Sequence, residues 1–185
     1  QIGHPASVLD VGCGHGRFFR YLRQHGMQAN LLGIDSSAAL IELGTPGDNE
    51  ELRVGDLFAL DELNQQFGWV TLFGVMHHIA GRKRRQDALR ILGRRVLPGG
   101  LLVVTYWRVA SQARFRDRFV EPEDELEPGD ALLRWDDTGM RYVHQIQPDE
   151  FEEHLALDDF TVEDRFLSDG ATGDLNEYVL WRNDS

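Results

Sequence analysis

Short apolar runs alternate with amphipathic segments along this chain. The apolar runs predict seven strands, at residues 7–11, 29–34, 52–54, 70–73, 101–107, 161–167 and 177–181. The amphipathic segments predict helices at residues 17–25, 38–43, 83–96 and 148–155. Strands that alternate with helices predict a mostly parallel, doubly wound α/β sheet that is covered on both faces. The last two strands flank a Gly- and Asp-rich loop at 168–176, which predicts a hairpin and a terminal antiparallel strand.

Residues with turn and capping preferences mark the predicted helix ends. Gly26 is a C-cap candidate for the helix that begins at residue 17. Ser36 or Ser37 is an N-cap candidate for the helix that follows. The sequence Pro98-Gly99-Gly100 predicts the end of the helix at 83–96.

The segment between the fifth strand and the last helix is too long for a structureless connection in a compact domain. We therefore expect residues 112–145 to form a lid or a substrate wall, within an insertion at about 108–147 of a single domain that covers residues 1–185. Apolar residues can attach this segment to the domain, namely Leu132, Leu133, Trp135, Tyr142 and Val143.

A glycine-rich turn follows the first predicted strand. The sequence Asp10-Val11-Gly12-Cys13-Gly14-His15-Gly16 places three alternating glycines between this strand and a helix. Glycines let the backbone adopt positive φ and approach a ligand closely, and the helix N-terminus supplies free N–H groups. The dinucleotide-binding pattern requires a glycine at its sixth position, where this chain has Arg17. The spacing therefore predicts a nucleotide-type site but disfavours NAD and FAD.

A second acid lies at the spacing that a nucleotide-type site requires for binding a ribose. Asp35 ends the second predicted strand, 19 residues after Gly16, and a carboxylate there can accept hydrogen bonds from both hydroxyls of a ribose. A third acid, Asp56, follows the third predicted strand. The alternative is that these acids only cap helices and turns.

The three acids and the G-x-G-x-G turn closely resemble the motifs of class I S-adenosylmethionine (SAM) dependent methyltransferases, which have a Rossmann-like fold. The resemblance covers nearly the whole chain. It implies that Asp56 binds the adenine amino group and that Leu57 lies against the ring. The cofactor-binding residues that we expect are Asp10, Gly12, Cys13, Gly14, Gly16, Asp35, Ser36, Asp56, Leu57, Phe73 and His77.

The composition is that of one domain with a sizeable core, at 185 residues. No 18-residue apolar run and no basic leader is present, so we expect neither a membrane span nor a signal peptide. The one cysteine, Cys13, excludes an internal disulfide and fits a reducing, cytoplasmic location. Methyltransferases usually carry helices ahead of the first strand, which is compatible with a numbering that begins inside a longer protein.

The net charge of −12 hides a segregation of charge along the chain. Residues 82–116 contain ten basic residues and one acid, whereas residues 117–164 contain 17 acids and three arginines. The basic stretch predicts either an exposed helix face, on which Asp87 can pair with Lys83 and Arg90, or a surface that binds a polyanion. Arginine outnumbers lysine 18 to one, and this compositional bias favours the first explanation.

The residues that follow strands four and five are the substrate-site candidates, because ligands bind at the carboxyl ends of parallel strands. His77 and His78 follow strand four and can hydrogen-bond a ligand or accept a proton. The alternative is that one of them packs against the adenosine and the other caps a helix. We expect no metal there, because no third ligand stands nearby.

Three short patches resemble the tRNA wobble-uridine carboxymethyl methyltransferases within this superfamily. They are His77–Ala88, Pro98–Gly100 with the strand that follows, and Arg141–His144. This resemblance implies esterification of a carboxymethyl group, which an arginine orients by a bidentate contact; the candidates are Arg84, Arg85 and Arg108. It also implies that the basic stretch binds the tRNA backbone and that eukaryotic members use a small activating protein subunit.

Several alternatives stay open at this point. The acidic total and the ending at 175–181 count against tRNA, so a small-molecule acceptor is slightly favoured, with a protein acceptor as a further choice. The catalytic candidates are His78, Arg84, Arg85 and Arg108. A non-catalytic SAM-binding subunit is the main alternative outside the enzymes, and a nucleotide-dependent oxidoreductase is the other. The oligomeric state is unknown.

Overall fold

The computed structural model describes residues 3–120, 126–135 and 139–185 and contains a seven-stranded and a three-stranded sheet. The strand order in the large sheet is β3-β2-β1-β4-β5-β10-β9. These strands are β1 (Ser7–Val11), β2 (Asn30–Asp35), β3 (Glu50–Val54), β4 (Phe67–Leu72), β5 (Val96–Trp107), β9 (Phe160–Ser168) and β10 (Asn176–Asn183). The first five strands are parallel, and β10 lies antiparallel between β5 and β9. The predicted fold class is confirmed.

The direction in which the chain adds strands reverses beside β1. From β1 the chain adds β2 and β3 on one side, and then returns to add β4 and β5 on the other. Val11 at the end of β1 is in register with Ile34 on β2 and with Leu72 on β4. The carboxyl ends of these three strands therefore meet at a topological switch point, where open α/β sheets bind their ligands.

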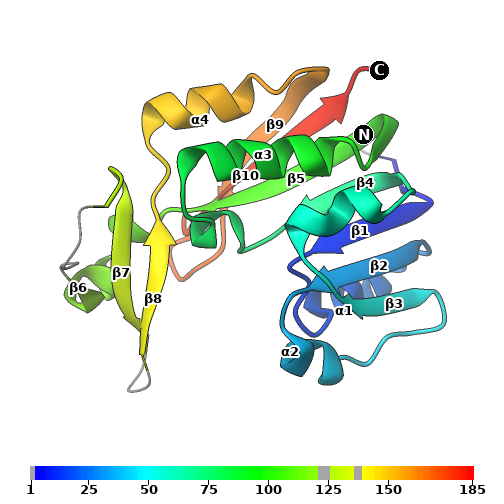
Figure 1. Cartoon of the computed structure of the whole chain (residues 1–185). Helices are drawn as coiled ribbons and strands as arrows, with labels where there is room; N and C mark the ends of the chain where they lie inside the picture. The colour runs from blue at the N-terminus through cyan, green and yellow to red at the C-terminus, as the bar shows by residue number, and fades with distance from the viewer. Residues whose placement is uncertain (1–2, 121–125, 136–138) are drawn as a thin grey trace.

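Helices cover the sheet in two layers (Figure 1). The α-helices are α1 (Arg17–Gln24), α2 (Ala38–Glu42), α3 (Arg82–Gly93) and α4 (Pro148–Leu155), and the 3-10 helices are η1 (Leu57–Glu62), η2 (Met76–His78), η3 (Val109–Ser111) and η4 (Ala113–Arg118). In the view of Figure 1, α3 and α4 lie in front of the sheet and α1 lies behind it. The larger apolar core joins the front face of the sheet to α3 and α4, and a smaller one joins β1 and β2 to α1.

The segment expected to form a lid or wall contains a small antiparallel sheet. Its strands are β6 (Phe119–Val120), β7 (Asp130–Trp135) and β8 (Gly139–His144), in the order β6-β7-β8. Leu133 and Val143 are fully buried against Trp107 and Phe115, which attaches this sheet to the end of β5. Part of the expected segment, 121–125 and 136–138, lies outside the described residues, as does the side chain of Trp135.

The predictions for 83–96 and 101–107 placed the boundary between helix and strand wrongly. Helix α3 ends at Gly93, and β5 begins at Val96 and continues through Pro98, where the sequence predicted only a stop. The reason is an irregularity in the pairing with β4, because Phe67 pairs with Val96 while Trp69 pairs with Leu101. The extra residues of β5 are accommodated there without loss of register beyond it.

The capping predictions can be compared directly with the structure. Ser37, and not Ser36, caps α2, since its hydroxyl accepts from the Leu40 N–H at 3.3 Å. Helix α1 ends just before Gly26, which has a φ of 73°. In the described part of the chain, no helix is long and apolar enough to cross a membrane.

Candidate cofactor and substrate site

The glycine-rich turn between β1 and α1 has the backbone that its sequence predicts. Gly12, Gly14 and Gly16 have φ values of 74°, 55° and 80°. A Cβ at Gly12 would lie 2.1 Å from Cγ2 of Val75, so this glycine allows the turn after β4 to pack on the loop. Among the described residues, a Cβ at Gly14 would have only Leu40 Cδ1 within 4 Å, at 3.9 Å. The backbone at Gly14 is therefore open to a ligand, whereas Gly12 serves the packing of the chain itself.

Asp35 at the end of β2 is held against this loop. Its Oδ2 accepts from the Gly14 N–H at 2.8 Å, and its Oδ1 accepts from the Ser37 N–H at 2.8 Å. The N–H groups of Gly12 and Cys13 donate to the carbonyl oxygen of Ile34 at 2.7 and 3.2 Å. These bonds fix the carboxylate beside the loop, in the place that a ribose-binding acid requires.

Asp10 lies at the end of β1 and is buried. Its Oδ1 accepts from the Thr71 hydroxyl at 2.6 Å. Burial raises the pKa of Asp10 to about 7, with a further contribution from Asp35, although the Thr71 hydrogen bond and Arg17 act in the opposite direction. The Thr71 hydrogen bond therefore links the end of β1 to β4.

The other predicted cofactor residues lie around the same edge with different exposure. Cys13 is buried, and burial raises the pKa of its thiol to about 12, so the thiol stays protonated. Ser36 is exposed. The exposed Asp56 caps η1 by accepting from the Phe58 N–H at 2.7 Å, and Leu57 is buried in the main core.

Phe73 follows β4 and joins a row of aromatic rings. Its ring centroid is 5.0 Å from that of Phe18 on α1 and 5.8 Å from that of Tyr178 on β10. Phe73 is half-buried. It therefore offers an apolar surface at the same strand edge as the loop.

His77 and His78 form the turn η2 after β4, and their environments differ. The buried His77 ring packs 4.5 Å from Trp107, and its Nδ1 has no hydrogen-bond partner in the part of the chain that the structure describes. Burial, together with His78 and Arg141, lowers the pKa of His77 to about 2, so this ring is neutral. His78 is exposed, and its Nδ1 lies 3.0 Å from the backbone oxygen of Tyr142 on β8.

The three candidate arginines lie in different surroundings. Arg84 is exposed, and its guanidinium lies 4.2 Å from the centroid of the Phe58 ring. Arg85 is buried and binds the carboxylate of Glu150 on α4 through two hydrogen bonds of 2.6 and 3.1 Å. Arg108 at the end of β5 lies 3.6 Å from a carboxylate oxygen of Asp174. Of the three, only Arg85 has its guanidinium inside the protein.

A buried ionic network joins the small sheet to α3 and α4, and sequence analysis did not predict it. Nδ1 of His144 lies 2.6 Å from Asp130 Oδ1, and its Nε2 lies 3.1 Å from Glu150 Oε2. Arg85 bonds Glu150 and also Glu127, the latter at 3.1 Å. Arg85 and Glu150 are 65 positions apart in the sequence and Arg85 and Glu127 are 42 apart, so no local pattern could reveal these contacts. Sequence analysis singled out His144 only as part of the Arg141–His144 patch and gave no indication of its partners.

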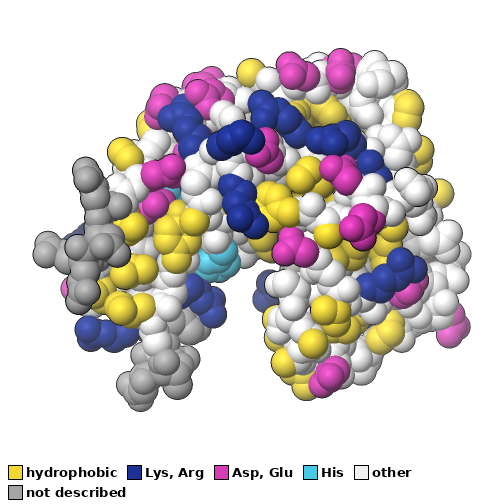
Figure 2. Space-filling model, viewed as in Figure 1, with side chains coloured by type: hydrophobic (Ala, Val, Ile, Leu, Met, Phe, Trp, Pro, Cys, Tyr) yellow, Lys and Arg dark blue, Asp and Glu magenta, His cyan; other side chains and the backbone are white. Residues whose placement is uncertain are grey.

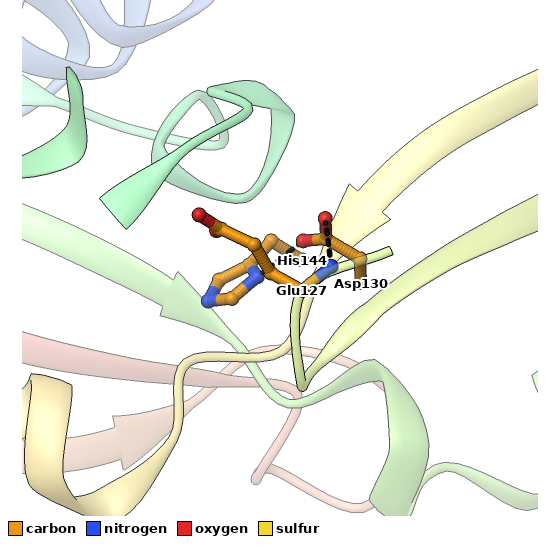
Figure 3. Close-up of side chains that lie close together, drawn as sticks. All are labelled: Glu127, Asp130 and His144. Atoms are coloured by element: carbon orange, nitrogen blue, oxygen red, sulfur yellow. Dashed lines mark hydrogen bonds and ion pairs between the residues drawn. The ribbon is translucent and has the colours of Figure 1, made fainter. Parts of the chain in front are cut away.

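Three members of this network, Glu127, Asp130 and His144, have ligand atoms close enough together to be compared with a metal site (Figure 3). Both ring nitrogens of His144 already contact carboxylates, and Arg85 supplies a positive charge beside Glu127 and Glu150. A metal ion would need one of these nitrogens as a ligand. Glu127, Asp130 and His144 therefore belong to an ion-pair network that joins the small sheet to α3 and α4.

The network predicts a specific loss of stability in acid. Burial acts to raise the pKa of Glu150, but the hydrogen bonds from His144 and Arg85 prevail and lower it to about 2. A lowered folded-state pKa stabilises the fold above about pH 4.5, and this contribution is lost as the pH falls from there towards about 2. Thermal unfolding between pH 6 and 2.5 should show a steeper loss in the wild type than in Glu150→Gln. The matched variant Glu152→Gln, at an exposed position of α4, should follow the wild type; equal slopes for all three proteins would contradict the assignment.

The basic stretch on α3 is largely neutralised by nearby acids. Arg82 pairs with Asp149 and Glu153 of α4 at 2.7 Å each. Asp87 pairs with Lys83 at 2.5 Å and with Arg90 at 3.2 Å, as its spacing predicted. Most of the charge on this helix therefore serves intramolecular contacts between α3 and its neighbours.

A hollow opens between the small sheet and the lobe that carries α2 (Figure 2). Lys and Arg side chains are visible on both of its walls, and a histidine is visible at its inner end. Two arginines act electrostatically on residues at or near the carboxyl ends of β1 and β4. The charge of Arg17 acts on Asp10 and Tyr178, and that of Arg141 acts on His77 and His78.

Comparison with known families agrees with this geometry. A family described as a methyltransferase domain matches residues 2–163. The chain belongs to this family and is a SAM-dependent methyltransferase with S-adenosylmethionine as its cofactor. The predicted class and cofactor are thus confirmed.

Relatives and solved structures are similar to the chain in different respects. It is 30% identical over 134 residues to a probable tRNA methyltransferase 9B of Bos taurus and 27% identical over 141 residues to a tRNA (carboxymethyluridine(34)-5-O)-methyltransferase of Arabidopsis thaliana. These matches cover 72% and 75% of this chain, but only 28% and 29% of the relatives. The fold is shared with a SAM-dependent methyltransferase of Methanosarcina mazei, with a TM-score of 0.75 and 20% identity over 98% of this chain and 93% of that one. It is also shared with the N-methyltransferase NodS of Bradyrhizobium japonicum in complex with S-adenosyl-L-homocysteine, with a TM-score of 0.69 and 17% identity over 99% and 80%.

The residues at the strand edge fit this cofactor. We propose that the open backbone at Gly14, the fixed carboxylate of Asp35 and the half-buried ring of Phe73 contact the methionine, ribose and adenine parts of SAM, respectively. Replacing Asp35 with alanine should remove a charge-assisted contact and weaken SAM binding by about 2 kcal/mol. Isothermal titration with SAM measures this, with Asp48→Ala as the control at an exposed acid of another loop. Equal affinity of Asp35→Ala and the wild type would disprove the ribose contact.

Proposed function

We propose that this domain transfers the methyl group of SAM to the carboxymethyl group of a wobble uridine in tRNA. Two relatives with tRNA methyltransferase names support this proposal over most of the chain. The structural observation that carries it is the hollow beside the cofactor edge, with basic side chains on both walls (Figure 2). Basic side chains around such a hollow can contact the phosphates of a nucleic acid.

The residues of the chain have simple tasks in this reaction. Bound SAM supplies a methyl group that its sulfonium activates. The acceptor is already a carboxylate at neutral pH, so no base has to remove a proton from it. The protein therefore has to bind the two partners, align them and exclude water. Asp35 and the glycine-rich turn hold the cofactor, and the small sheet forms the opposite wall.

Arg141 and Arg84 are the arginines that we assign to the tRNA substrate. Arg141 lies on β8, and its charge acts on His77 and His78. Arg84 is exposed near the start of α3, directly after the histidine turn. We do not extend this assignment to Arg85, because Glu150 and Glu127 already hold its guanidinium.

A small-molecule acceptor is the second candidate, and two observations favour it. The net charge is −12, and most of the basic residues of α3 are paired with acids of the same chain. Both features reduce the attraction of a polyanion. The cytoplasmic location and an activating protein subunit remain predictions under either candidate.

Transfer of radiolabelled methyl from SAM to two separate pools tests these candidates. The first pool is total tRNA from cells that lack this protein, and the second is the small-metabolite fraction of the same cells. We expect label in tRNA, and we expect Arg141→Gln to reduce it more than tenfold through loss of a charge-assisted contact. Arg94→Gln is the control, because Arg94 follows the other end of α3 and pairs with Asp61. Label in metabolites alone would reject the tRNA proposal and support the second candidate.

A further inference from the structure

The two ring nitrogens of His78 have different surroundings. Nδ1 lies 3.0 Å from the backbone oxygen of Tyr142, which belongs to the small sheet. Nε2 has no hydrogen-bond partner among the described residues, and the side chain is exposed. One nitrogen therefore joins the turn after β4 to the small sheet, while the other is available for a further hydrogen bond.

The contact with Tyr142 determines which nitrogen carries the hydrogen. A carbonyl oxygen only accepts hydrogen bonds, so Nδ1 must be the donor. Burial lowers the pKa of His78; the Tyr142 contact acts against this, and Arg141 lowers it further. The ring is therefore neutral at pH 7, and Nε2 keeps its lone pair.

The turn that carries His78 is fixed next to the cofactor loop. Val75 packs on Gly12, and the Gly74 N–H donates to the Thr105 hydroxyl at 2.9 Å. On the other side, the Tyr142 hydroxyl donates to Asp130 at 2.5 Å, which fixes the strand that offers the carbonyl. Both partners of the Nδ1 contact are thus held in place. Their positions fix the orientation of the His78 ring and therefore of Nε2.

We propose that His78 binds the methyl acceptor through Nε2, which accepts a hydrogen bond from an N–H or O–H group of the acceptor. This inference rests on the proposed function and adds a requirement to it, since the acceptor must carry a hydrogen-bond donor that reaches Nε2 of His78. The ring N–H of a uracil base is such a donor. His78 then orients the base, and the carboxylate attacks the methyl group without proton transfer to the histidine.

The tautomer can be measured without knowledge of the substrate. Nitrogen NMR of the ¹⁵N-histidine-labelled protein with S-adenosyl-L-homocysteine distinguishes the two neutral tautomers and the charged ring. The variant His78→Asn identifies the signals of this residue. We expect a proton on Nδ1 and none on Nε2 at pH 7.5. A proton on Nε2 would overturn the proposal, whether the ring is in the other tautomer or charged.

Two amide variants separate the role of Nε2 from that of the Nδ1 contact. Asparagine can place an N–H near the position of Nδ1 and preserve the contact with Tyr142, but it has no acceptor at the position of Nε2. Glutamine can place an oxygen near Nε2. We expect His78→Asn to lower kcat/KM for total tRNA about tenfold and His78→Gln to restore part of the loss, with unchanged affinity for SAM. His25→Asn is the control, because His25 Nδ1 makes the same kind of contact, with the Tyr21 oxygen at 2.8 Å.

The outcomes separate the failure of this inference from that of the proposed function. If His78→Asn retains the kcat/KM of the wild type, His78 only joins the sheets and the proposal fails. If the wild type labels metabolites and not tRNA, the proposed function fails, and the same variants are then compared on the metabolite pool. A tenfold loss there would keep His78 as an acceptor-binding residue for a different substrate.

Discussion

Replacing Gly14 with valine should reduce SAM affinity more than a hundredfold, the largest effect that we expect on binding. The reason is steric, because the backbone at Gly14 is open and only Leu40 Cδ1 lies within 4 Å of a Cβ built there. A branched side chain at this position would occupy the space of the cofactor and not that of the protein. Gly12→Val is a poorer test, since its Cβ would collide with Val75 and disturb the turn itself. Isothermal titration with SAM measures the loss.

Backbone strain needs a separate control, because Gly14 has a positive φ that valine rarely adopts. Gly26 provides it, with a φ of 73° and no atom within 4 Å of a built Cβ. Gly26→Val should lose stability by an amount similar to that of Gly14→Val but should bind SAM normally. If both variants bind SAM normally, the cofactor does not lie against Gly14.

Replacing Arg85 with methionine should destabilise the fold by about 3–5 kcal/mol, the largest effect that we expect on stability. Glu150 is almost fully buried, and the substitution would leave it with His144 as its main partner. A buried carboxylate that loses its cation retains the cost of desolvation without the compensating attraction. Urea unfolding followed by circular dichroism measures the difference.

Arg84→Met is the matched control on the same helix. Its guanidinium is exposed over the Phe58 ring, so the loss should be about 0.5–1 kcal/mol. The pair also separates the two arginines in function, since Arg84→Met should fold normally and lose tRNA methylation. Similar destabilisation by both substitutions would show that the network around Glu150 contributes little.

The sequence predicted the glycine-rich turn and the acid at the end of β2 because these features depend on local geometry. The turn after β1 needs glycines at fixed positions, and the acid that ends β2 is brought to it by parallel strand pairing. Each of these requirements acts over a few residues or over one strand pair. They leave a pattern in the order and spacing of Asp10, Gly12, Gly14 and Asp35.

The substrate side was less predictable, because its residues meet across long distances in sequence. The carbonyl that sets the tautomer of His78 belongs to Tyr142, 64 residues later. Arg85 was grouped with Arg84 as a substrate candidate, although it faces inwards to Glu150. Two adjacent arginines look alike in sequence, and only the position of α4 distinguishes the buried one from the exposed one.

The sequence by itself thus determined the order along the chain of the strands in the large sheet and of the four α-helices, the glycine-rich turn and the class of cofactor, since hydrophobic periodicity and glycine spacing record these features directly. Only the tertiary structure decided which charges are neutralised, how the 112–145 segment folds against the end of β5, and which nitrogen of His78 is free. These depend on contacts between elements remote in the chain. The free energy of such a contact depends on both partners and on how they pack together. The sequence around either partner alone therefore does not predict the contact.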